Sequence, residues 1–107
     1  MRYVAVFFKE GPHIDDERVH AAAHEEFVSS LIRRNLVLLG GAFPHEVDGA
    51  WAAYVLRCGS IEEARAITAK DPFVTNEDMR PVAVEWRLVG INPQVIDPEE
   101  IVTPRDV

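Results

Sequence analysis

The chain has 107 residues, 48% of them hydrophobic, and a formal net charge of -7. This size predicts one domain with a hydrophobic core, and the charge argues against nucleic-acid or anionic-membrane partners, which need clustered Lys and Arg. The single cysteine, Cys58, excludes an intrachain disulfide and fits a reducing compartment. No apolar run approaches the ~18 residues of a membrane span or matches a signal sequence. We therefore expect a cytoplasmic protein.

The first half of the chain predicts a strand, a helix and a second strand. Residues 3–8 are apolar at both alternating sets of positions, as in a central strand that helices cover on one face and, most simply, a second subunit on the other. Residues 18–34 carry apolar side chains at helical spacing. Residues 36–43 predict the second strand, in which the Gly40–Gly41 pair indicates either a bulge or a ligand close to the backbone.

The second half predicts a hairpin, a helix and a last strand. Residues 44–49 form the predicted turn, with Asp-Gly as its hairpin signal. Residues 50–58 are again apolar on both faces and predict a second central strand. Residues 61–70 predict a helix that opens with a Ser-x-x-Glu capping box. Residues 81–88 alternate between apolar and polar, which predicts an edge or half-buried strand that starts at a proline.

The predicted order, β-α-β-β-α-β, is that of a ferredoxin-like α+β fold. It places two helices on one face of a four-stranded antiparallel sheet, and residues 1–90 form this domain. The other face is a natural dimer surface. Residues 91–107 are rich in proline and acidic residues, and we expect an extended tail that packs on a partner subunit.

His24 is the first candidate site residue, because its spacing from Phe27 and Val28 turns it towards the buried side of its helix. A buried histidine needs a hydrogen-bond partner. It can be a satisfied core residue or an acid/base group tuned near neutrality. His20 and His24 have the i, i+4 spacing of metal ligands, but no third ligand is evident apart from Asp71, so we expect no metal.

Asp71 is the second candidate. It can cap a helical turn that starts at Pro72. It also follows the end of the helix 61–70, where a carboxylate is unfavourable unless a cation such as an imidazolium lies nearby. His24 and Asp71 can meet if the two helices are antiparallel, and they lie at opposite ends if the helices are parallel. Arg57, at the end of the third strand, either binds an anionic substrate or is a surface residue.

Four segments follow one another along the chain: His24-x-x-Phe27-x-x-x-Leu31, LLGGAFP at 38–44, SIEEA at 60–64, and Asp71-Pro72-Phe73-Val74. With the Val/Trp strand that follows, they resemble the YciI-like (YCII-related) family over residues 2–90. The resemblance implies a dimeric α+β barrel of ferredoxin-like subunits and a His/Asp site at His24 and Asp71. The family's relatives include a dehydrochlorinase and proteins like muconolactone isomerase, which implies cofactor-free acid/base chemistry. The long loop before the first helix and the Pro-rich tail depart from the family pattern.

We therefore predict a homodimeric, cofactor-free lyase or isomerase that acts on a small molecule. His24 would move a proton, and Asp71 would fix its tautomer and stabilise the imidazolium. The predicted substrate-binding residues are Gly40, Gly41, Phe73 and Arg57. The alternatives are a module that binds a small metabolite without turnover and a structural dimerisation domain.

Overall fold

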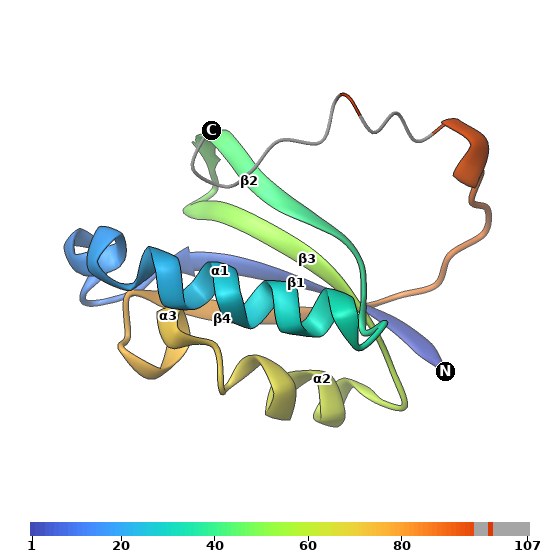
Figure 1. Ribbon diagram of the computed structural model, residues 1–107, viewed down its shortest axis with the longest axis horizontal. Helices are drawn as coiled ribbons and strands as arrows, with labels where there is room; N and C mark the ends of the chain where they lie inside the picture. Colours follow the sequence, from blue (N-terminus) through green and yellow to red (C-terminus); the bar gives the residue numbers. More distant parts are fainter. Residues whose placement is uncertain (96–98, 100–107) are drawn as a thin grey trace.

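The computed structural model describes residues 1–95 and 99, and it shows a four-stranded antiparallel sheet with helices on one face (Figure 1). The strands are β1 (Arg2–Glu10), β2 (Val37–Val47), β3 (Ala50–Cys58) and β4 (Met79–Trp86). The helices are α1 (Glu17–Arg33), α2 (Ile61–Thr68) and α3 (Pro72–Thr75), and short 3-10 turns cover Ile14–Asp16 and Pro93–Val95. The predicted ferredoxin-like α+β fold is confirmed.

The sheet order is β2-β3-β1-β4, so β1 and β3 are the central strands and β4 is an edge, as predicted. Successive side chains of a strand point to opposite faces. In β1, the set Val4, Val6 and Phe8 lies under the helices and is almost completely buried. The other set of β1 faces away from the helices, towards what we call the open face of the sheet.

The second strand is longer than predicted, because residues 44–47 belong to β2 and not to a turn. The turn consists of Asp48 and Gly49 alone, which have positive φ values of 50° and 80° and match the two-residue hairpin type. Pro44 is tolerated within the strand because β2 is at the edge of the sheet, where one side of the backbone needs no partner.

Two local signals at the helices are confirmed, and one boundary moves. The Ser60 hydroxyl accepts a hydrogen bond from the backbone N–H of Glu63 at the start of α2. Asp71 caps α3, with Pro72 at its first turn. The last strand, predicted over residues 81–88, is shifted by two residues, because β4 covers Met79–Trp86.

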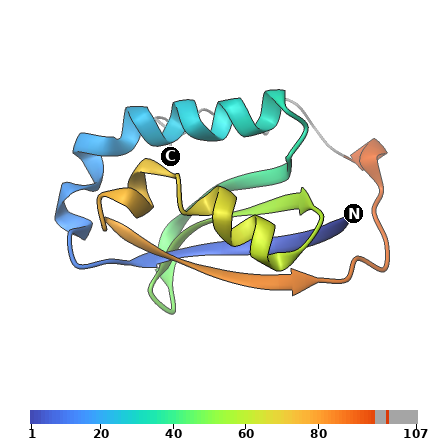
Figure 2. The same ribbon diagram turned by 90° about the horizontal axis from the view of Figure 1, so that it is seen from below.

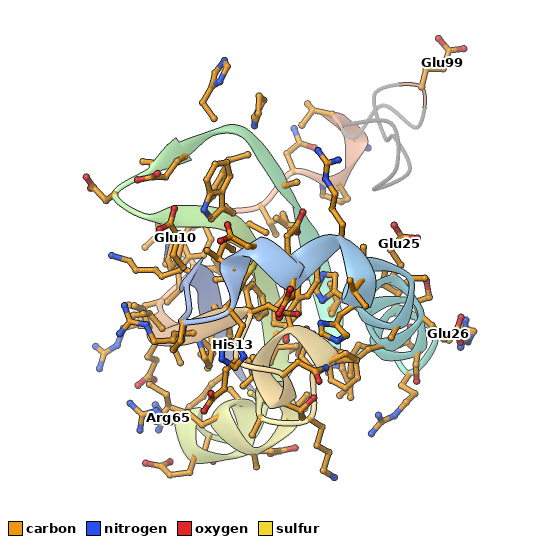
Figure 3. All side chains as sticks on the ribbon, turned by 90° about the vertical axis from the view of Figure 1, so that its left-hand side faces the viewer. Glu10, His13, Glu25, Glu26, Arg65 and Glu99 are labelled. Carbon is orange, nitrogen blue, oxygen red and sulfur yellow. The ribbon has the colours of Figure 1, made fainter. Side chains whose placement is uncertain are left out.

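Helices α1 and α2 lie on the same face of the sheet and run in opposite directions (Figures 1 and 2). This decides between the two arrangements left open by the sequence. The antiparallel arrangement brings α3 against α1, and the side chains of His24 and Phe73 are in contact there. Figure 3 shows Glu26 on the outer side of α1, where it pairs with Arg33.

The open face carries exposed apolar side chains, among them Leu39 at 60% exposure, Val84 at 48% and Trp86 at 50%. The predicted packing of the C-terminal tail falls largely on residues 96–98 and 100–107, which lie outside the described residues. In the part of the chain that the structure describes, no helix is both long and apolar enough to cross a membrane.

Candidate functional site

His24 and Asp71 form a direct pair. The Nδ1 atom of His24 lies 2.8 Å from Oδ1 and 2.9 Å from Oδ2 of Asp71. The Asp71 side chain is fully buried, and the His24 side chain is 15% exposed. An ionised carboxylate only accepts hydrogen bonds, so Nδ1 carries the proton and donates it. Nε2 is then the ring nitrogen left to act on another molecule.

The backbone fixes the Asp71 carboxylate in place. Its Oδ1 accepts a second hydrogen bond, of 2.9 Å, from the N–H of Phe73, since Asp71 is the N-cap of α3. The positive end of α3 and two N–H donors therefore stabilise the buried negative charge. The capping role and the pairing role, which the sequence left as alternatives, are filled by one side chain.

Two aromatic rings fix the orientation of the imidazole. The ring of Phe73 stacks on His24 with centroids 4.0 Å apart and planes 14° apart. The ring of Phe8 meets it edge-on at 5.9 Å. These apolar walls reduce the local dielectric constant and strengthen the His24–Asp71 interaction.

Tyr54 lies behind this pair and was not predicted as part of the site. Its ring packs edge-on against Phe8 at 4.9 Å, and its hydroxyl donates a 3.5 Å hydrogen bond to Thr68. Burial strongly raises the pKa of Tyr54, and the nearby charge of Asp71 raises it further. Tyr54 therefore stays protonated. Strand alternation with the buried Leu56 could have placed it on the helix side of β3.

A second histidine–aspartate pair lies one helical turn away. The Nδ1 atom of His20 is 2.5 Å from Oδ2 of Asp78, whose side chain is fully buried. The His20 side chain is 27% exposed. In the sequence, His20 stands out only through its metal-ligand spacing to His24, and Asp78 is not predicted. The single available signal was the i, i+4 spacing of the two histidines.

The other predicted site residues lie in different places. Phe73 belongs to the site through its ring stack on His24. Gly40 faces the helix side, where a Cβ atom would lie 2.8 Å from the Cβ of Tyr54. Gly41 pairs with Ala53 and faces the open side of the sheet, where a Cβ atom would meet nothing within 4 Å. Arg57 pairs with Tyr3 and is exposed on the same open face.

Other features limit the chemistry of the site. Cys58 is buried, and burial raises the pKa of its thiol, which disfavours the reactive thiolate.

Within the described residues, no three His, Cys, Asp or Glu side chains form a group that could hold a metal. An apolar hollow of about 360 Å³ includes Phe7 and Val82 in its lining. It opens on the face of the sheet opposite to His24.

Comparison with known proteins identifies a relative by sequence and solved structures of similar fold. No family model matches the chain. The dehydrochlorinase TftG from Burkholderia phenoliruptrix AC1100, which acts on 5-chloro-2-hydroxyhydroquinone and was solved with 2,5-dihydroxybenzoquinone, superposes with a TM-score of 0.64. That match covers 79% of this chain and 93% of TftG at 16% identity, which shows a shared fold.

The uncharacterized protein YjpA of Bacillus subtilis (strain 168) is 33% identical over 69 residues, which are 64% of this chain and 78% of YjpA. This similarity extends over most of the relative's length. The chain therefore belongs to the same family as YjpA.

Proposed function

We propose that the protein is a YciI-like, cofactor-free lyase or isomerase in which His24 and Asp71 carry out acid/base chemistry on a small molecule. The observation that carries the proposal is the hydrogen bond from Nδ1 of His24 to the buried Asp71 carboxylate. It leaves Nε2 with a free lone pair on a side chain that is still partly exposed. The fold shared with TftG, an enzyme that acts on a small molecule, supports the proposal by analogy.

The proposed reaction begins with a proton transfer to Nε2 of His24 from an acidic C–H or O–H group of the substrate. Asp71 stabilises the imidazolium that forms, and the stack on Phe73 keeps the ring in position. The electron pair left on the substrate then either expels a leaving group or shifts a double bond. In the first case, the imidazolium passes its proton to the leaving group or to water, and in the second it returns the proton to a different atom of the substrate. General acid/base catalysis of this kind contributes roughly 10²–10⁴-fold in rate.

The remaining predicted substrate contacts differ in how well the geometry supports them. Phe73 touches the His24 ring and can also touch a substrate bound at Nε2. Gly40 is explained by the approach of Tyr54, without a ligand. A role for Gly41 or Arg57 requires a molecule that reaches the open face of the sheet. These three residues stay predictions.

The activity can be tested with two compounds, 5-chloro-2-hydroxyhydroquinone and 2,5-dihydroxybenzoquinone. Chloride release from the first and binding of the second would be measured for the unsubstituted protein and for His24→Gln. We expect His24→Gln to lower turnover by roughly 10²–10⁴-fold. As a matched control, His45→Gln changes an exposed histidine of β2 and should have no effect. Unchanged turnover in His24→Gln would refute the catalytic role, and binding without any turnover would favour a metabolite-binding module.

We also propose that the protein is a cytoplasmic homodimer in which the open sheet faces of two copies meet. The support is the set of exposed apolar side chains that includes Leu39, Val84 and Trp86. Exposing a contiguous apolar surface to water is unfavourable, and monomeric proteins rarely do so. Val84→Asp should convert a dimer into monomers in sedimentation equilibrium. Val19→Asp, on the exposed side of α1, is the matched control. A monomeric unsubstituted protein would refute the proposal.

A further inference from the structure

The pair His20–Asp78 has the same construction as His24–Asp71 but has no place in the chemistry above. In both pairs, Nδ1 of a histidine on α1 faces a carboxylate whose side chain is fully buried. In both, the second ring nitrogen is left for another partner. The His20 side chain is the more exposed of the two, at 27% against 15%. His20 is therefore the more accessible of the two imidazoles.

The loop that carries Asp78 is held firmly by the segment after β1. The N–H of Gly11 donates to the carbonyl of Asp78 at 3.0 Å, and the N–H of His13 donates to the carbonyl of Glu77 at 2.9 Å. Gly11 approaches so closely that a Cβ atom there would lie 2.5 Å from the Glu77 oxygen. Glu77 itself has a positive φ of 59°, which is uncommon for a residue other than glycine. The carboxylate is thus positioned by a well-defined backbone.

The two carboxylates differ in how far their hydrogen bonds are satisfied. Both oxygens of Asp71 are in contact with His24, and one also accepts from the Phe73 backbone. For Asp78, Oδ1 is buried and has no hydrogen-bond partner among the described residues. A buried acceptor without a partner is unfavourable and is uncommon in native proteins without a functional reason. This oxygen belongs to the carboxylate that holds His20, and the surrounding protein encloses it, so the Asp78 side chain must turn before a bound donor can reach it.

The two histidines are close enough to act on one small molecule. His20 and His24 are four residues apart on α1, so they lie on the same helix face with Cβ atoms roughly 5–6 Å apart. Their carboxylate partners both come from the short segment that contains α3 and leads into β4. Both pairs therefore join α1 to this segment.

We infer that His20 and Asp78 form a second binding and proton-transfer pair of the same site, which takes a small molecule with two hydrogen-bonding oxygens, such as a hydroxy-carbonyl or dihydroxy compound. This inference rests on the proposed function, and it names the substrate class. While Nε2 of His24 removes a proton from the substrate, a protonated His20 donates one to the second oxygen or to the atom where negative charge develops. The substrate keeps its proton count. His24 ends protonated and His20 neutral, and exchange with water restores both.

Binding of 2,5-dihydroxybenzoquinone to protein labelled with ¹⁵N-histidine tests the inference. Calorimetry gives Kd, and the ring ¹⁵N signals report the protonation state of each histidine. We expect the ligand to shift the signals of both His20 and His24. His20→Gln should weaken binding by about tenfold, as expected for a lost hydrogen bond to a charged group. Asp78→Asn keeps the side-chain volume, and it should weaken binding and change the Nδ1–H tautomer signature of His20.

The outcomes separate this inference from the proposed function. The loss of binding in His24→Gln with an unchanged Kd in His20→Gln would overturn the second pair alone. The absence of binding by the unsubstituted protein would overturn the inferred substrate class, whereas the proposed function is refuted by unchanged turnover in His24→Gln. His45→Gln is the control and should leave Kd unchanged, because His45 is exposed on β2. Melting curves identify any variant that fails to fold. If His20→Gln fails to fold, His20→Asn replaces it, because a shorter polar side chain can be accommodated at this partly exposed position.

Discussion

The two histidine–aspartate pairs on α1 share a geometry and differ in their surroundings. His24–Asp71 is enclosed by the rings of Phe73 and Phe8, and its carboxylate has a backbone donor as well. His20–Asp78 is more exposed on the histidine side, and one carboxylate oxygen is unpaired among the described residues. The same histidine–carboxylate contact is thus enclosed and fully hydrogen-bonded in one place, and more exposed and incompletely hydrogen-bonded in the other.

The largest difference in stability between the two pairs should appear when each carboxylate is removed in turn. Asp71→Ala removes a charged hydrogen bond and the cap of α3, and we expect it to lower the free energy of unfolding by about 3 kcal/mol. Asp78→Ala should cost less, about 1–2 kcal/mol, because it also removes an unsatisfied buried oxygen. Urea unfolding followed by circular dichroism measures both. Equal costs would contradict the contrast between the two pairs.

A smaller effect should appear at alkaline pH at Tyr54, behind the first pair. Burial raises the pKa of Tyr54 in the folded state, so the unfolded chain releases this proton first as the pH rises. The contribution of Tyr54 to the free energy of unfolding is therefore constant below pH ~10. Above this pH, the free energy of unfolding should fall by about 1.4 kcal/mol per pH unit. Unfolding between pH 9 and 11 tests this, and Tyr54→Phe should remove that part of the pH dependence. A slope that Tyr54→Phe leaves unaltered would assign it to other groups.

The smallest effect should come from the ring stack. Phe73→Leu keeps a buried apolar side chain but removes the stack on His24, and we expect a loss of about 1 kcal/mol in stability. The His24 ring should also become less ordered, while the His20 ring should not change. Ring relaxation of ¹³C-labelled histidine distinguishes the two. Loss of order at both histidines would mean that the pairs are not independent.

Much of the fold follows from local patterns in the sequence. Both central strands were predicted from residues that are apolar on both faces, and the capping box at Ser60 placed the start of α2. The predicted length of β2 was wrong, because Pro44 and the polar residues after it have the composition of a turn. The strand continues through them as an irregularity in the pairing with β3, between the pairs Ala42–Ala52 and Val47–Ala50.

The candidate site also has features that local sequence patterns predict and contacts that only the tertiary structure creates. The residues themselves indicated that His24 needs a polar partner and that Asp71 caps a turn, because helical spacing and capping act within about four positions of the chain. The contact between them spans 47 positions, and that between His20 and Asp78 spans 58. Nothing local to Asp78 marks it, since its burial depends on Gly11 and the segment after β1. The sequence by itself thus determined the elements and their apolar faces, whereas only the antiparallel packing of the helices on one sheet face decided which side chains meet.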